Sequence, residues 1–270
     1  MPELPEVETT RRGLLPDLAG RRIDGLVVRQ RRLRYPVPRN LSGLIAGQTL
    51  QDIDRRGKYL LFRFARGTLI VHLGMSGSLR LVGAAESAGR HDHLDIVFGP
   101  SALRLRDPRR FGAVLWTAGD AAAHPLIAPL GIEPLTEAFD GAWLHAATRG
   151  RGTPVKLLLM DSHRIVGVGN IYASESLFRA GIDPRTPAGR LSLARCARLA
   201  EAVKATLAAA IAAGGSSLRD FIHSDGSSGW FQQQHLVYDR AGQPCRRCGS
   251  PIRALRMGQR ATFRCPRCQR

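Results

Sequence analysis

The sequence predicts an α+β protein with a helix and antiparallel strands first, a helical region second and a metal-binding hairpin last. Three observations predict this fold class. Short segments that alternate apolar with polar residues recur between positions 25 and 116, a helical pattern runs from 141 to 214, and two C-x2-C pairs stand near the C-terminus. A chain of 270 residues can hold two domains, each with its own core.

The first eight residues, Met-Pro-Glu-Leu-Pro-Glu-Val-Glu, lead into a helix predicted over about Pro5–Leu18. If Met1 is removed, Pro2 presents a free secondary amine, with Glu3 beside it and Glu6 one helical turn on. Such an amine attacks a sugar or aldehyde carbon and forms an iminium ion. A generic α-amino group has a pKa of about 7.7–8, against about 10.4 for Lys, so much more of it is neutral at pH 7. Glu3 is placed to donate or accept a proton.

A plainer interpretation explains part of the same stretch. Pro5 suits the first turn of a helix, and Glu6 and Glu8 complement the positive end of the helix dipole. This interpretation gives Pro2 and Glu3 no role. The motifs in the rest of the chain favour the catalytic interpretation.

The segments after this helix are predicted to be short strands, because apolar and polar residues alternate and Gly, Pro and Asp separate the runs. Many short strands at close spacing predict an antiparallel sandwich or barrel. Prolines at 125, 129 and 134 then mark a domain boundary near 120–135. The predicted strands are Gly25–Arg29, Lys58–Phe64, Thr68–Leu73, Ser78–Leu81, His93–Phe98, Ala102–Arg106 and Ala113–Trp116.

From position 141 the pattern is helical. Ser192 is expected to cap the last helix, and Gly214 and Gly215 are expected to end it. A Gly- and Ser-rich stretch, Ser216–Phe231, follows and is predicted to be a mobile surface loop. The predicted helices are Trp143–Thr148, Val155–Leu159, Ala173–Ala180 and Leu193–Ala213.

Two glycines in Gly167-Val168-Gly169 let the backbone approach a ligand closely, and Asn170 opens the next helix. Backbone amides at a helix N-terminus suit a phosphate. A lone G-x-G motif is nevertheless weak evidence for phosphate binding.

Four cysteines, Cys245, Cys248, Cys265 and Cys268, form the pattern C-x2-C-x16-C-x2-C. Each C-x-x-C pair can direct two thiolates at one tetrahedral ion, so the sequence predicts one structural zinc site. The fifth cysteine, Cys196, lies in a predicted helix and is expected to be a small buried residue.

The composition predicts a phosphate-rich partner. Lys and Arg number 40 against 22 acidic residues, so the formal charge is +18. No basic amphipathic anchor is visible, which favours nucleic acid over a membrane as the partner. No apolar run of about 18 residues and no signal peptide are visible either, so a cytoplasmic protein is expected. The segment Cys245–Arg270 holds eight Arg and no acid, so the zinc hairpin is expected to face DNA.

These motifs together resemble the formamidopyrimidine-DNA glycosylase family of bacterial base-excision enzymes, and the resemblance runs from end to end. It implies a β-sandwich domain over 1–125, a helical domain with a helix–two-turn–helix motif over 126–223, and the end of a lesion loop with a zinc finger over 224–270. It also implies one structural zinc ion and a monomer bound to duplex DNA. The motifs are the first eight residues, Lys58-Tyr59-Leu60, His72-Leu73-Gly74-Met75-Ser76-Gly77, Asp107-Pro108-Arg109-Arg110-Phe111-Gly112, Gly167–Glu175 and Gln259-Arg260-Ala261-Thr262-Phe263.

The resemblance implies a role for each matching residue. Pro2 would be the nucleophile, Glu3 the acid–base group that helps to open the sugar ring, and Glu6 a supporting carboxylate. Lys58 and Arg260 would be the remaining catalytic residues and would bind the phosphates around the flipped nucleotide. The remaining implied residues are His91, Lys156 and Asn170 for DNA binding, Met75, Arg109 and Phe111 for the duplex wedge, and Arg219, Ser224, Gly226 and Gly229 for the lid over the extruded base.

The function that the resemblance implies is a bifunctional glycosylase and abasic-site lyase. It would remove 8-oxoguanine and formamidopyrimidines through a Schiff base on Pro2 and cleave the strand by β,δ-elimination. A non-catalytic DNA-binding protein would need no free N-terminal amine, and the related endonuclease VIII typically has Gly where this chain has Leu4. Arg219 stands where family members often carry Lys, so the lesion preference stays open.

Overall fold

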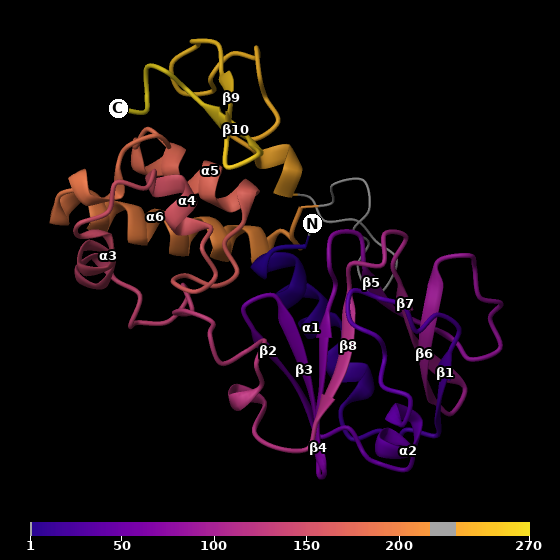
Figure 1. Cartoon of the computed structure of the whole chain (residues 1–270). Coiled ribbons are helices and arrows are strands. Elements are labelled where there is room, and N and C mark those ends of the chain that lie inside the picture. Colours follow the sequence, from indigo (N-terminus) through magenta and orange to yellow (C-terminus); the bar gives the residue numbers. More distant parts are fainter. Residues whose placement is uncertain (1, 217–230) are drawn as a thin grey trace. The chain divides into compact units, whose positions relative to one another are not determined.

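The structure is a computed structural model that describes residues 2–216 and 231–270 (Figure 1). Its backbone contacts divide the chain into two compact units. Unit 1 comprises Met1–Ala128 with Gly214–Trp230, and unit 2 comprises Pro129–Ala213 with Phe231–Arg270. Within the described ranges, no helix is long and apolar enough to cross a lipid bilayer.

Unit 1 begins with helix α1 (Leu4–Leu18), which confirms the predicted N-terminal helix. Pro5 stands in its first turn, where a missing N–H costs no intrahelical hydrogen bond. Its residues Val7, Leu14 and Leu18 are fully buried. They recur at helical spacing, so one face of α1 covers the core of this unit.

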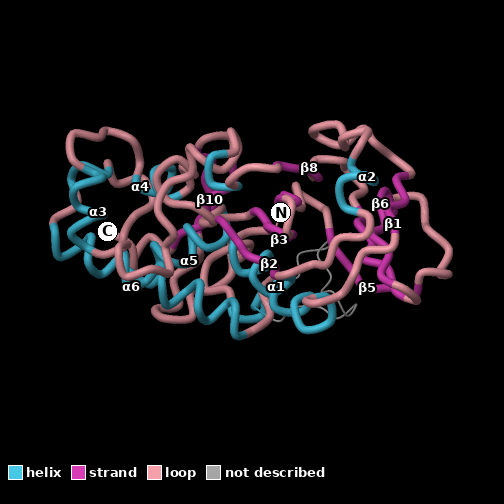
Figure 2. The backbone as a smooth tube through the Cα atoms, turned by 90° about the horizontal axis from the view of Figure 1, so that it is seen from below, coloured by secondary structure: helices cyan, strands magenta, loops and turns pink. Residues whose placement is uncertain are grey.

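Eight strands of unit 1 form two antiparallel sheets of four, in the orders β1-β6-β7-β5 and β2-β3-β4-β8. Figure 2 shows these strands in magenta. Two short helices, α2 (Leu41–Ile45) and η1 (Ala121–Ala123), accompany them. The strands are β1 (Gly25–Val28), β2 (Asp52–Arg56), β3 (Tyr59–Phe64), β4 (Gly67–His72), β5 (Ser78–Gly83), β6 (Asp92–Phe98), β7 (Ser101–Arg106) and β8 (Ala113–Thr117).

One hydrophobic core joins α1 to both sheets. Phe62 and Val71 from one sheet and Ile96 and Leu105 from the other belong to the same buried cluster as Leu14 of α1. Two sheets that share one core form a sandwich, so the barrel alternative is wrong and the β-sandwich is confirmed.

Unit 2 consists of the helices α3 (Gly141–Thr148), α4 (Val155–Leu159), α5 (Asn170–Ala180) and α6 (Leu193–Ala212), with the short η2 (Ala188–Arg190) and η3 (Phe231–Gln234). Helix α6 packs against α3 and α5. The hydroxyl of Ser192 accepts from the N–H of Arg195 at 3.3 Å, and Gly214 has a φ of +74°, so both predicted ends of α6 are confirmed. Cys196 is fully buried in α6, as predicted.

The chain ends in an antiparallel hairpin of β9 (Arg253–Met257) and β10 (Arg260–Arg264). The two residues of its turn, Gly258 and Gln259, both have positive φ. A separate apolar cluster, which includes Phe178 of α5 and Phe263 of β10, packs the hairpin against the helices of unit 2.

Candidate functional site

The first turn of α1 brings Pro2, Glu3 and Glu6 together. All three residues are buried. The carboxylate of Glu6 accepts from the backbone N–H of Glu3 at 2.7 Å and, through its other oxygen, from the N–H of Ser216 at 2.8 Å. Glu6 therefore joins the start of the chain to a residue 210 positions later.

Gly215 is the residue that allows this approach. Its φ is +78°, and a Cβ atom added there would lie 3.0 Å from Oε1 of Glu6. A side chain at this position would therefore be strained and would press on the carboxylate.

Lys58 lies in a two-residue turn rather than in a strand. The predicted strand from Lys58 begins one residue later, at Tyr59, because Arg56 pairs with Tyr59 and leaves Gly57 and Lys58 to close the hairpin. Gly57 has a φ of +58°, which a tight hairpin turn favours. The Lys58 side chain is half-buried.

The predicted wedge residues come from two turns whose backbones touch. Met75 lies in the turn that follows β4, and Arg109 and Phe111 lie in the turn that follows β7. A Cβ atom added to Gly74 would lie 2.4 Å from the carbonyl carbon of Phe111, so only glycine permits the contact. The Phe111 side chain is 44% exposed, and the Arg109 guanidinium lies 4.9 Å from the centre of its ring.

Asp107 is the buried residue that holds these two turns together. Its carboxylate accepts from the Ser76 hydroxyl at 2.9 Å and from the Gly112 N–H at 2.8 Å. The Ser76 hydroxyl oxygen in turn accepts from the Arg109 N–H at 3.2 Å. Sequence reasoning gave Asp107 and Ser76 no role of their own, although both stand in the motifs that carry the resemblance.

Two histidines lie beside the same turns. The carbonyl of His91 accepts from the Asp107 N–H at 3.0 Å, which places His91 next to the wedge. The ring Nδ1 of His72 accepts from the Gly74 N–H at 2.9 Å. Burial, together with the charges of Lys58 and Arg34, lowers the pKa of His72 to about 4, so the ring is a neutral acceptor at pH 7.

In unit 2 the structure joins Lys156 and Asn170 to the zinc hairpin. The Lys156 ammonium is fully buried and donates to the Asn170 Oδ1 and the Thr262 hydroxyl, both at 2.6 Å. The Asn170 amide donates to the Ala261 carbonyl at 3.0 Å. These bonds fix the start of β10, where Arg260 is exposed. Sequence reasoning missed Thr262 as a partner of Lys156.

A second buried acid, Glu175 of α5, holds the segment that precedes the hairpin. Its carboxylate accepts from the backbone N–H groups of Leu236, Val237 and Tyr238 at 2.9 to 3.0 Å. Burial raises the pKa of Glu175, and these three hydrogen bonds oppose the increase. The sequence signal for Glu175 was its place at the end of the motif that begins at Gly167.

The four cysteine sulfurs of the hairpin lie within 4.8 Å of one another. The Cys245–Cys268 and Cys248–Cys265 sulfur pairs are 3.9 and 3.4 Å apart. In a tetrahedral site with Zn–S bonds of about 2.3 Å, the sulfurs lie about 3.8 Å apart. Backbone N–H groups of Arg247 and Cys268 point at the sulfurs of Cys245 and Cys265. The site therefore fits one structural zinc ion, as predicted.

The residues predicted to form the base lid, Arg219, Ser224, Gly226 and Gly229, lie outside the residues that the structure describes.

A β-sandwich domain that begins with a Pro-Glu pair and a helix, together with a helical unit that ends in a four-cysteine ribbon, is the architecture of a class of DNA glycosylases. Three family models match: the formamidopyrimidine-DNA glycosylase N-terminal domain over 1–114, its H2TH domain over 130–222, and a zinc finger found in FPG and IleRS over 242–270. The chain belongs to the formamidopyrimidine-DNA glycosylase family, whose members are glycosylases with abasic-site lyase activity.

Individual relatives agree with this assignment. Proteins named formamidopyrimidine-DNA glycosylase from Aromatoleum aromaticum and Bordetella petrii are 61% and 60% identical, and each match covers 100% of both chains. The crystal structure of the MutM (Fpg) protein from Thermus thermophilus is similar with a TM-score of 0.89 and 39% identity, over 99% of this chain and 98% of that chain. A complex of Lactococcus lactis Fpg with DNA that contains an abasic site is similar with a TM-score of 0.92 and 34% identity, over 99% of both chains.

Proposed function

We propose that this protein removes oxidised purines, namely 8-oxoguanine and formamidopyrimidines, from duplex DNA and then cleaves the strand at the abasic site. The observation that carries the proposal is the start of α1, where Pro2 is buried and the Glu6 carboxylate accepts from the N–H groups of Glu3 and Ser216. A similar structure of Lactococcus lactis Fpg contains Fapy-dG DNA, which supports an oxidised purine as the substrate.

In the proposed reaction the Pro2 nitrogen attacks C1′ of the damaged nucleotide, and the glycosidic bond breaks as the base leaves with a proton. Glu3 donates a proton to O4′, the C1′–O4′ bond opens, and the nitrogen loses its hydrogen to form the iminium ion. Loss of the C2′ proton expels the 3′ phosphate, and a second elimination expels the 5′ phosphate. Water then hydrolyses the iminium ion and frees Pro2.

The other predicted residues bind the DNA in this proposal. Lys58, His91, Asn170 and Arg260 contact phosphates around the flipped nucleotide, and Lys156 adds its charge from a buried position. The exposed Phe111 and the neighbouring Met75 and Arg109 enter the duplex, where an apolar wedge parts the base steps and Arg109 reads the orphaned base.

Zinc has no part in the proposed chemistry. Four thiolates fill a tetrahedral zinc ion and leave no position for water. We further propose that the protein acts as a monomer in the cytoplasm, with Arg219, Ser224, Gly226 and Gly229 beside the extruded base.

Borohydride trapping on a duplex that carries 8-oxoguanine tests the proposal. Intact mass is expected to show that Met1 is missing, and peptide mapping is expected to place the reduced DNA adduct on Pro2. An adduct on Lys58 or Lys156 would overturn the assignment of the nucleophile. Tight lesion binding without excision or trapping would instead identify a non-catalytic DNA-binding protein.

A further inference from the structure

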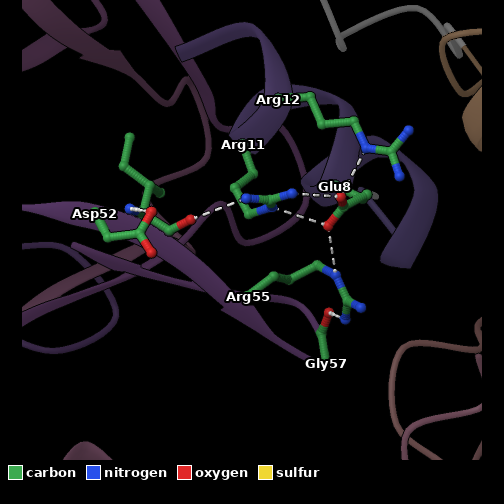
Figure 3. A network of polar contacts seen from close by, with 7 residues as sticks. Glu8, Arg11, Arg12, Asp52, Arg55 and Gly57 are labelled. Atoms are coloured by element: carbon green, nitrogen blue, oxygen red, sulfur yellow. Dashed lines mark hydrogen bonds and ion pairs between the residues drawn. The ribbon is translucent and has the colours of Figure 1, made fainter. Parts of the chain in front are cut away.

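The carboxylate of Glu8, on the second turn of α1, is buried among three arginines (Figure 3). Arg11 and Arg12 of the same helix donate to it at 2.8 to 3.1 Å, and Arg55 of β2 donates at 3.1 Å. Burial alone raises the pKa of Glu8, but the hydrogen bonds from Arg11 and Arg12 and the charge of Arg55 outweigh it and hold the pKa at about 2. Glu8 is therefore charged at neutral pH.

Arg55 joins this carboxylate to the hairpin turn that carries Lys58. Its Nε donates to Glu8, and its terminal nitrogen donates to the Gly57 carbonyl at 2.9 Å. A single rigid guanidinium thus contacts α1 on one side and the turn on the other, as Figure 3 shows. Only 11% of the Arg55 side chain is exposed, so solvent screens this ion pair little.

We propose that Glu8 and Arg55 are positioning residues that set the distance between the N-terminal amine and Lys58. The inference rests on the proposed function, in which Pro2 attacks C1′ while Lys58 holds a nearby phosphate. Pro2 precedes α1 by two residues, and Lys58 follows Gly57 directly, so each group is attached to one of the two elements that this link joins. A misplacement of about 1 Å can cost on the order of 100-fold in rate, so such a link has a measurable effect.

The test is the single-turnover rate of strand cleavage on abasic-site duplex at saturating enzyme, for Glu8→Gln, Arg55→Gln and Arg55→Lys. We expect each variant to lower the first-order rate constant about 10-fold or more. The Arg55→Lys variant should recover little of the rate, because an ammonium cannot reproduce the geometry in which the guanidinium donates to both the Glu8 carboxylate and the Gly57 carbonyl. As long as the folded enzyme saturates the duplex, this rate constant does not depend on the fraction of protein that is unfolded, so a loss of stability alone leaves the rate unchanged.

Two ion pairs supply matched controls. Arg12 donates to the same carboxylate from within α1, and its side chain is 62% exposed, so Arg12→Gln removes a partner of Glu8 without breaking the link to β2. Asp54→Asn removes the exposed pair with Arg63 on the β2–β3 hairpin. Both controls should stay within about 2-fold of wild type, because each removes an interaction of a solvent-exposed side chain that does not join α1 to β2.

The double variant Glu8→Gln/Arg55→Gln should be no slower than the slower single variant, because the two residues act as one link. Affinity for a duplex with an uncleavable tetrahydrofuran abasic analogue should change little. Wild-type rate constants in both Arg55→Gln and Arg55→Lys would overturn the inference. So would an equally large loss of rate in Arg12→Gln, or a loss in the double variant equal to the sum of the two single losses in activation free energy. If wild-type protein were not trapped on Pro2, the proposed function itself would fall, and the two failures are therefore distinguishable.

Discussion

At the scale of single residues, Glu3 and Glu6 form a capping box at the start of α1, in which each side chain accepts from the backbone N–H of the other residue. Glu6 uses both carboxylate oxygens to accept backbone N–H groups, which suits a structural support. Glu3 is the carboxylate next to the proposed nucleophile, so our proposed mechanism gives the proton transfer to Glu3.

Glu3→Gln should abolish base excision and preserve DNA binding, because an amide cannot exchange the proton. We expect a loss of about 100-fold or more in single-turnover excision of 8-oxoguanine, with the affinity for damaged duplex within a few fold of wild type. Glu201→Gln, at an exposed position of α6, is the control and should leave both quantities unchanged. Wild-type excision by Glu3→Gln would remove Glu3 from the mechanism.

The lowered pKa of Glu8 makes the free energy of unfolding depend on pH at acidic pH. Its pKa falls from about 4.5 in the unfolded chain to about 2 in the fold, so the unfolded chain takes up the proton more readily. The stabilisation is therefore fully present above about pH 4.5 and is lost as the pH falls toward 2. Its size is on the order of 3 kcal/mol.

Denaturant unfolding of wild type and Glu8→Gln between pH 3 and pH 7 measures this effect. The difference in unfolding free energy should be constant near neutral pH and should shrink below about pH 4.5. A difference that held its value at pH 3 or grew there would contradict the lowered pKa.

At the scale of elements, the two wedge turns depend on a glycine contact. Gly74→Ala should force the turns apart, because its φ is +65° and the new Cβ would meet the Phe111 carbonyl carbon at 2.4 Å. We expect a loss of about 1–3 kcal/mol in unfolding free energy and weaker discrimination of the base opposite the lesion. Gly83→Ala is the control, since a Cβ there meets nothing within 4 Å. If Gly74→Ala and Gly83→Ala discriminated the base opposite the lesion equally well, Gly74 would have no role in the wedge.

The zinc hairpin is an element whose fold depends on its metal. Cys248→Ser should release the ion, unfold β9 and β10 and weaken DNA binding, because a structural zinc site supplies folding energy directly. Metal analysis should find one zinc per wild-type chain, and Cys196→Ala should keep it. If the stripped protein bound DNA normally but lost excision, the metal would have a catalytic role.

The sequence predicted most elements but not the contacts between them. Strand β2 was missed because Asp-Ile-Asp-Arg-Arg is mostly polar and shows little apolar alternation. The hydrogen bond between Ser76 and Asp107 and the burial of Lys156 against Thr262 join residues 31 and 106 positions apart. Periodicity and spacing report local structure, so such pairs are visible only in the folded chain.

At the scale of the whole molecule, the charge of +18 predicts general attraction to duplex DNA. Variants of Arg260 distinguish this general attraction from binding that depends on the lesion. Arg260→Ala should reduce excision and lesion binding more than binding to undamaged duplex, because a guanidinium holds a phosphate through two parallel hydrogen bonds. Arg260→Lys should restore little.

Arg256→Ala, at an exposed position of β9, should instead weaken binding to damaged and undamaged duplex alike and lower the salt slope by about one. Salt titrations with both duplexes measure the difference. Full excision by Arg260→Lys would show that Arg260 acts through charge alone.

The hydrogen bond between Glu6 and Ser216 also imposes an order on biosynthesis. Residue 216 follows Glu6 by 210 positions, so it leaves the ribosome roughly 10–40 s later at about 5–20 residues per second. During that interval the nascent amino terminus cannot yet close against its last partner, and an aminopeptidase can reach Met1. Removal of Met1, which the proposed mechanism requires, would then take place while the chain is being made. A purification tag fused ahead of Pro2 would both block the amine and crowd the buried turn that Glu6 completes.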